Sequence, residues 1–173
     1  MIFQYGPFPT LVYVVTTMYR GVTNAAPITW VSPISYEPPL IMISVKKESD
    51  TVRNIMNNGK FVVQTVPYHM AQKIHNMAKS YPRDISELSE QKLATVKESI
   101  LSVPRLVLAT DWYECVSKTI HMYGNDHCQV IGKVKHYKRN KIDRKFASCR
   151  PLLYCGGLTY NKEESTDFDV DPY

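Results

Sequence analysis

The sequence predicts a mainly β domain with a few helices, in which long paired strands favour a barrel. Runs of β-branched and aromatic residues recur along the chain, whereas helical periodicity is confined to two or three short segments. The runs Trp112 to His121 and His127 to Tyr137 flank Tyr123-Gly124-Asn125-Asp126, whose residues suit the positive φ angles of a turn. We expect these two runs to form a long antiparallel hairpin.

Length and composition indicate one globular domain. The chain has 173 residues, of which 44% are hydrophobic and 21% charged. We place the domain at residues 1–160 and an acidic C-terminal extension at residues 161–173, because one Lys accompanies five acidic residues after residue 161. Between Lys133 and Arg150, eight basic residues accompany one Asp. Such a surface favours an anionic partner, which could be a nucleic acid, a nucleotide cofactor or the acidic extension itself.

The segment from Gly21 to Leu40 is expected to be an irregular ligand-binding loop between two buried strands. Its four prolines remove backbone donors and restrict φ, which should interrupt both neighbouring strands. Asn24, Thr29, Ser32 and Ser35 then offer hydroxyl, amide and N–H groups to a polar, planar ligand. An ordinary Pro-rich connection is the alternative. The expected strands are Leu11–Thr17, a broken Ile28–Pro33, Leu40–Val45, Lys60–Thr65, Leu106–Leu108, Trp112–His121, Cys128–Tyr137 and Leu152–Tyr154.

The first helix is expected to begin at an N-cap, Ser49 or Asp50, and to end at Gly59. Its start predicts a phosphate site, because first-turn N–H groups, the hydroxyls of Ser49 and Thr51, and Lys46 or Lys47 converge there. A capped surface helix with solvated lysines is the alternative. The residues expected on its apolar face are Val52, Ile55 and Met56.

Two further helices are expected downstream. The second follows Pro67 and places Met70, Ile74 and Met77 at helical spacing, where methionines serve as core filler. The third covers about Leu88 to Leu101.

The cysteine and histidine pattern does not predict a metal site. Cys115, Cys128, Cys149 and Cys155 show no C-x-x-C pairing. His121, His127 and Cys128 lie close in sequence, but His127 and Cys128 would point to opposite faces of a strand, which disfavours a shared metal. The sequence shows no signal-peptide pattern and no apolar run of membrane-spanning length, so we expect a cytoplasmic protein with reduced thiols and no membrane partner.

Four segments, in order, resemble the flavin reductase-like family of FMN-binding split barrels, which includes the flavoredoxins. VYVVTTMYRGVTNAAPITWVSPISYEPPLIMISV resembles that family's strand, N-x-A-P loop, S-x-x-P-x-S turn and PP-strand. DTVRNIMNNGKFVVQTV resembles its helix and following strand, NDHCQVIGKV its D-H-x-x-x-x-G-x-V strand, and RPLLYCGGLTY its closing P-L-x-Y-x-G-G strand. The resemblance covers roughly Leu11 to Tyr160 and implies a split β-barrel with Greek-key-like connections.

The resemblance implies a homodimer that binds one FMN per subunit near the subunit interface. The isoalloxazine ring would lie against Asn24 to Ser32, where Thr29, Trp30, Val31 and Ser32 supply apolar contact and backbone hydrogen bonds; Trp30 could instead be a core or dimer-interface aromatic. The phosphate would sit at Lys46, Ser49 and Thr51, and Lys79 and Ser80 match positions that close over the flavin.

His127, which matches the family's D-H, is the candidate catalytic residue that would contact nicotinamide or tune the flavin; a structural His bonded to the Asp126 loop is the alternative. Cys155 could be a redox-active thiol, although a buried small apolar residue is favoured because no partner Cys lies at disulfide-motif spacing.

The leading functional interpretation is an NADH- or NADPH-dependent FMN reductase, in which a hydride passes from nicotinamide to flavin without need of a protein acid or nucleophile. The alternative is a flavoredoxin-type electron carrier that a redox protein partner reduces. A third interpretation, a nucleic-acid-binding basic barrel, is disfavoured because Lys133–Arg150 lacks the regular aromatic interleaving of single-strand binders.

Overall fold

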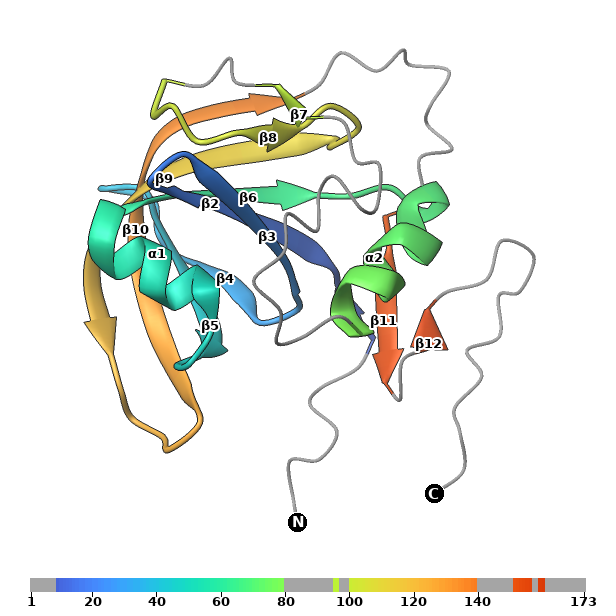
Figure 1. The fold of residues 1–173 in the computed structure, drawn as a ribbon, viewed down its shortest axis with the longest axis horizontal. Helices are drawn as coiled ribbons and strands as arrows, with labels where there is room; N and C mark the ends of the chain where they lie inside the picture. Colours follow the sequence, from blue (N-terminus) through green and yellow to red (C-terminus); the bar gives the residue numbers. More distant parts are fainter. Residues whose placement is uncertain (1–8, 80–94, 97–99, 140–150, 157–158, 161–173) are drawn as a thin grey trace.

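Seven antiparallel strands form the main sheet of the protein, in the order β3-β2-β6-β9-β10-β5-β4 (Figure 1). The fold comes from a computed structural model that describes residues 9–79, 95–96, 100–139, 151–156 and 159–160. The strands of this sheet are β2 (Tyr13–Tyr19), β3 (Val22–Ile28), β4 (Val31–Ser35), β5 (Leu40–Lys46), β6 (Lys60–Thr65), β9 (Asp111–His121) and β10 (His127–Arg139).

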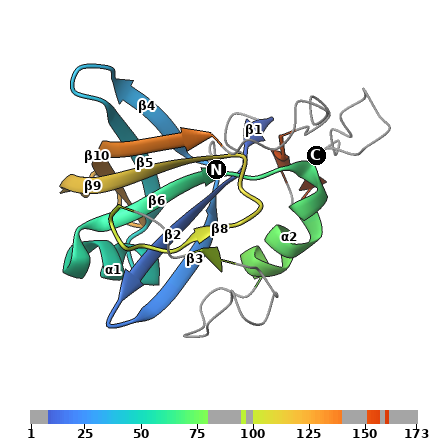
Figure 2. The same ribbon diagram turned by 90° about the horizontal axis from the view of Figure 1, so that it is seen from above.

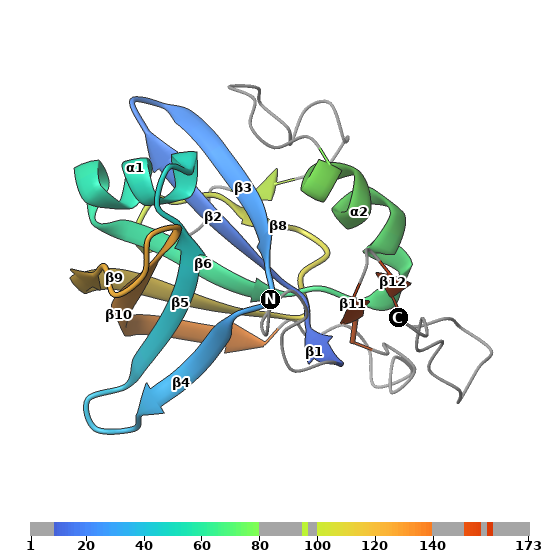
Figure 3. The same ribbon diagram turned by 90° about the horizontal axis from the view of Figure 1, so that it is seen from below.

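The connection between β3 and β4 shows that the sheet curls into a barrel. These strands lie at opposite edges of the sheet, yet only Thr29 and Trp30 separate them in sequence. Three residue steps span at most about 10 Å, so the two edges must meet at this connection. From there β3 and β4 run apart (Figure 3), which leaves the barrel split.

The expectation of an irregular loop from Gly21 to Leu40 was wrong. Val22–Ile28 pairs with β2, placing Pro27 opposite Val14, and Val31–Ser35 pairs with β5, placing Pro33 opposite Ile41. Both strands are edge strands, and an edge strand tolerates proline because the missing N–H can face away from its only neighbour. Thr29 and Trp30 separate the two strands, and residues 36–39, which include Pro38 and Pro39, form the turn between β4 and β5.

The expected hairpin of β9 and β10 forms the longest pairing of the sheet, with Val130 opposite Ile120 and Lys138 opposite Trp112. Alternate residues of β10 point into the barrel, where Cys128 and Val130 are fully buried. Gly132 continues this inward row and lies against the ring of Phe61. The barrel interior is filled chiefly by Val, Ile, Phe and Cys side chains.

Helix α1 (Asp50–Asn58) begins and ends where the sequence predicts. Ser49 is the N-cap, and Gly59 ends the helix in the left-handed region with φ of 69°. Val52 and Ile55 pack into the barrel core as expected. Met56 does not, since it is 63% exposed.

The buried face of α1 includes two polar residues of the helix itself. With these two residues facing inward, Met56 is left on the exposed side, which explains the wrong prediction for Met56. Thr51 and Asn54 are buried, and they hydrogen-bond Asn24 on β3 and Thr17 on β2, respectively. These bonds orient the helix together with its apolar contacts.

A second, smaller layer joins the ends of the described chain (Figures 1 and 2). Strand β1 (Thr10–Leu11) pairs with β11 (Leu153–Gly156), which pairs with β12 (Thr159–Tyr160). The 3-10 turn η1 (Tyr68–Met70) leads into α2 (Ala71–Lys79), whose Ile74 and Met77 are buried as predicted. No helix in the described ranges is long and apolar enough to cross a membrane.

The third predicted helix, Leu88 to Leu101, lies largely outside the described residues. Thr95–Val96 within it forms β7, so this part was wrongly predicted as helical. Its partner β8 (Arg105–Leu106) is shifted from the expected strand at Leu106–Leu108, because Arg105 and Leu106 are the residues that pair with β7.

Candidate functional site

Trp30 and His127 come together where the two barrel edges meet. Trp30 lies in the β3–β4 connection, and its carbonyl accepts a hydrogen bond from the Ser44 N–H of β5 at 2.9 Å. His127 begins β10, and its ring centroid lies 5.0 Å from that of Trp30. Trp30 is 42% exposed, so its indole can still offer apolar surface to a planar ligand.

His127 also makes the contact expected of a structural histidine. Its Nδ1 lies 2.9 Å from Oδ2 of Asp126, and this bond holds the pKa of the Asp126 carboxyl below its usual value. Asp126 is fixed in turn by its carbonyl, which accepts from the Lys47 N–H at 3.0 Å. One bond therefore orients the imidazole that contacts Trp30. The predicted opposition of His127 and Cys128 is confirmed, since Cys128 is buried in the barrel core.

The first turn of α1 brings Thr51 next to Asn24 of β3, and both residues were predicted to bind the cofactor. The Ser49 hydroxyl caps the helix by accepting from the Val52 N–H at 3.3 Å. The Thr51 hydroxyl accepts from the Asn24 side-chain amide at 3.0 Å. A hydroxyl that accepts from an amide keeps its own hydrogen to donate, which suits an anionic ligand at a positively polarised helix end. Thr51 is only 1% exposed, so a ligand can reach this hydrogen only when the groups that cover it move aside.

Lys46 links the Trp30–His127 pair to the first turn of α1. It is the last residue of β5 and lies opposite His127 in the β5–β10 register. Its carbonyl accepts from the Ser49 N–H at 3.0 Å. Its side chain is exposed beside the first turn of α1.

Three predicted ligand-contact residues do not lie in an open loop as expected. Val31 and Ser32 belong to β4, and Thr29 lies in the short connection before it. The Thr29 carbonyl accepts from the Thr10 hydroxyl and from the Val31 N–H. Val31 packs on the barrel core, and Ser32 pairs opposite Met42 with its hydroxyl bonded to the Pro33 carbonyl. These residues therefore shape the wall beside Trp30, with part of their polar capacity used within the protein.

Several predictions fall on residues whose placement is not described. Lys79 ends α2, but its side chain lies outside the described part, as does Ser80 entirely. The Cys155 side chain in β11, the basic residues 140–150 and the acidic extension also lie outside it. Among the described residues, no three His, Cys, Asp or Glu side chains gather to hold a metal ion.

Gln129 is a polar neighbour of this region that the sequence analysis did not single out. It lies two residues after His127 on β10, so it shares the outward face of that strand. The alternation of buried and partly exposed residues along β10 could have placed it there.

The model of the family described as "Flavin reductase like domain" matches residues 5–161 of the chain. The chain belongs to the flavin reductase-like family. Uncharacterized protein BH2278 of Halalkalibacterium halodurans is 30% identical over 93% of this chain and 84% of its own length. Uncharacterized protein YwrF of Bacillus subtilis is 33% identical over 67% of this chain, which spans 58% of YwrF.

Two solved structures share the fold. Nitrilotriacetate monooxygenase component B from Bacillus cereus is 25% identical, with a TM-score of 0.83 over 98% of this chain and 91% of that one. An FMN-binding protein from Thermus thermophilus is 22% identical, with a TM-score of 0.77 over 91% of this chain and 88% of that one. The predicted family and its mainly β barrel fold are confirmed.

Proposed function

We propose that this flavin reductase-like protein binds FMN and reduces it with NADH or NADPH. The observation that supports the proposal is that Lys46 links the two predicted subsites, since it lies opposite His127 in the β5–β10 register and its carbonyl accepts from the Ser49 N–H. Thr51, Asn24 and the capped start of α1 form one subsite, and Trp30 with His127 forms the other.

The residues present fit a flavin mononucleotide. Its phosphate suits the N-terminus of α1, where Ser49 and Thr51 carry hydroxyls and Lys46 brings a positive charge. Its planar ring suits the exposed face of Trp30. When bound, the flavin supplies the hydride chemistry, while the protein supplies position and electrostatics.

His127 is the candidate for orienting a second planar ligand beside the flavin. Its bond to Asp126 sets the direction of the imidazole, and its contact with Trp30 places that imidazole at the ring end of the site. Nicotinamide would then stack on the exposed flavin face, which accounts for a reductase without a Rossmann G-x-G-x-x-G motif.

The electron-carrier alternative keeps the same flavin site and replaces the nicotinamide with a redox protein partner. Neither alternative changes the roles proposed for Asn24, Ser49 and Thr51. We also propose a homodimer, in keeping with the family resemblance, and a cytoplasmic location.

Two measurements test the proposal in order. Purified protein is first titrated with FMN, and quenching of flavin fluorescence reports binding; the absence of binding at high micromolar FMN would reject the flavin site. The FMN-loaded protein is then mixed anaerobically with NADH or NADPH. Bleaching of the flavin absorbance supports the reductase, whereas a spectrum unchanged after minutes with both nucleotides rejects it in favour of the carrier.

A further inference from the structure

The side-chain amide of Gln129 on β10 is incompletely paired. Its Nε2 donates to the Ser44 hydroxyl at 3.5 Å, while its Oε1 is buried without a hydrogen-bond partner in the described part of the chain. Turning the amide over would leave the nitrogen in place of the oxygen, so one polar atom lacks a partner in either orientation. A buried, unpaired amide oxygen costs stability and calls for an explanation.

Gln129 lies in line with the subsite formed by Trp30 and His127. In the sheet register it lies opposite His121 of β9 on one side and Ser44 of β5 on the other. The Ser44 N–H bonds the Trp30 carbonyl, so one row crosses the sheet from Trp30 through Ser44 to Gln129. His127 lies two residues away on the same face of β10.

We propose that Gln129 is a flavin-recognition residue that pairs with the imide edge of the isoalloxazine. That edge presents an N–H donor between two carbonyl acceptors. A glutamine amide can meet it with two parallel hydrogen bonds, accepting from N3–H with Oε1 and donating to a neighbouring carbonyl with Nε2. The inference rests on the proposed function, and it adds a side-chain contact to the pyrimidine end of the ring.

The amide can reach a ligand although its oxygen is buried. Gln129 as a whole is partly exposed, and the last torsion of a glutamine side chain is soft, so the amide can turn toward the surface when a ligand arrives. Its bond to Ser44 is long, which makes that partner easy to leave. A ligand that completes the amide's hydrogen bonds therefore removes a cost that the ligand-free protein carries.

The first test compares Gln129 with Gln64, a buried glutamine whose amide is fully paired. Gln64 is fully buried, donates to the Thr16 hydroxyl at 3.0 Å and accepts from the Leu106 N–H at 2.6 Å. We expect Gln64→Met to lower the melting temperature of the ligand-free protein and leave FMN affinity unchanged. Gln129→Met should leave the melting temperature unchanged or higher and weaken FMN binding about tenfold.

The second test removes the donor from the ligand. Wild-type protein should bind FMN about tenfold more tightly than N3-methyl-FMN, and Gln129→Met should bind the two within about twofold. Wild-type protein that binds both flavins equally, or a variant that discriminates as wild type does, would overturn the assignment. A Gln129→Met protein that melts lower, as Gln64→Met does, would also overturn it. Wild-type protein that binds neither flavin would instead reject the proposed function itself.

Discussion

The side-chain amide of Asn24 donates a hydrogen bond to the Thr51 hydroxyl at 3.0 Å. This bond joins an edge strand of the barrel to the first turn of α1, and Thr51 is only 1% exposed. The orientation of a proposed phosphate-binding hydroxyl therefore depends on a strand that lies at the far edge of the sheet from β5.

We predict that Thr51→Val weakens FMN binding about tenfold and costs about 1 kcal/mol of stability, because it removes the hydroxyl while keeping the side chain's shape. Asn24→Ala should weaken binding by a smaller factor, because the hydroxyl remains without its orienting donor. Fluorescence titration and urea unfolding measure the two effects. A double mutant whose loss equals the sum of the single losses would show that the two side chains do not act together.

Ser49 allows helix capping to be separated from phosphate binding. Asp is as good an N-cap as Ser, so Ser49→Asp should preserve stability while placing a negative charge against the phosphate. Together with Lys46→Glu it should prevent FMN binding. Ser49→Ala is the control: it should lose about 1 kcal/mol of stability with a milder loss of affinity. Stoichiometric FMN in the Lys46→Glu, Ser49→Asp protein would contradict this phosphate assignment.

Gly132 is required by the packing of Phe61. A Cβ at position 132 would lie 2.4 Å from Cζ of Phe61 and 3.0 Å from Cβ of Cys115. Both neighbours belong to the buried core, so Gly132→Ala should destabilise the protein by about 1–3 kcal/mol in urea unfolding. Adding Phe61→Leu removes the clashing ring atoms, and the double mutant should be more stable than additivity predicts. Strict additivity would show that the ring is not the obstacle.

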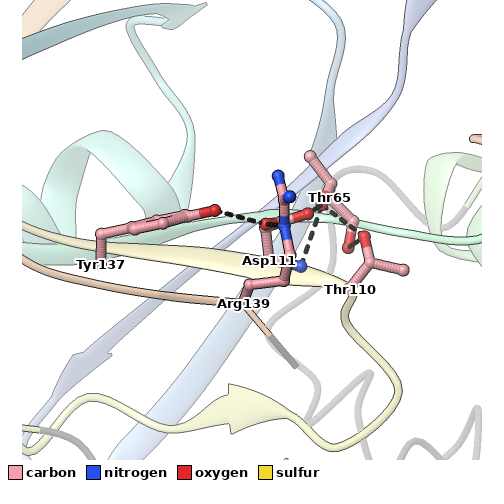
Figure 4. Close-up of polar contacts among 5 residues, drawn as sticks. All are labelled: Thr65, Thr110, Asp111, Tyr137 and Arg139. Atoms are coloured by element: carbon pink, nitrogen blue, oxygen red, sulfur yellow. Dashed lines mark hydrogen bonds and ion pairs between the residues drawn. The ribbon is translucent and has the colours of Figure 1, made fainter. Parts of the chain in front are cut away.

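We predict that Asp111 makes the unfolding free energy depend on pH in the acid range (Figure 4). Burial disfavours its charge, but hydrogen bonds from Arg139 and Tyr137, each at 2.8 Å, outweigh burial and hold the pKa of the carboxyl below its usual value. Thr65 adds a further bond at 3.3 Å.

Because the folded pKa is depressed, the stabilisation is complete above the unfolded pKa of about 4 and is lost as pH falls through the folded value. Unfolding free energies measured between pH 5 and pH 2.5 should therefore fall less steeply in Asp111→Asn than in wild type. Identical slopes would show that Asp111 does not contribute.

Cys115 should be inert in the folded protein. Burial raises the pKa of its thiol to about 12, with a further contribution from Glu114, and burial also raises the pKa of the Cys128 thiol. We expect iodoacetamide at pH 8 to leave both thiols unmodified until urea is added, because the thiolate is the reactive form. Peptide mapping by mass spectrometry measures this, and rapid native labelling of Cys115 would contradict its burial.

Local patterns in the sequence were sufficient for the caps, the hairpin and the family. Ser49 caps the helix with its side chain and Gly59 ends it with a positive φ, both within a few positions along the chain. The hairpin forms as predicted from its two flanking runs, but none of residues 123–126 has the left-handed φ from which the turn was predicted. The buried positions of Ile74 and Met77 follow from helical spacing.

The sequence by itself determined the mainly β class, the start of α1 and the candidate residues at Trp30, Ser49, Thr51 and His127. Only the tertiary structure decided that the Pro-rich segment forms two edge strands, that Met56 faces outward and that Trp30 meets His127. It also decided that the Gln129 side-chain oxygen finds no partner among the described residues. The reason is physical: caps and turns depend on neighbouring residues. Whether a proline can sit in a strand, or a buried amide finds a partner, depends on which distant segment lies beside it.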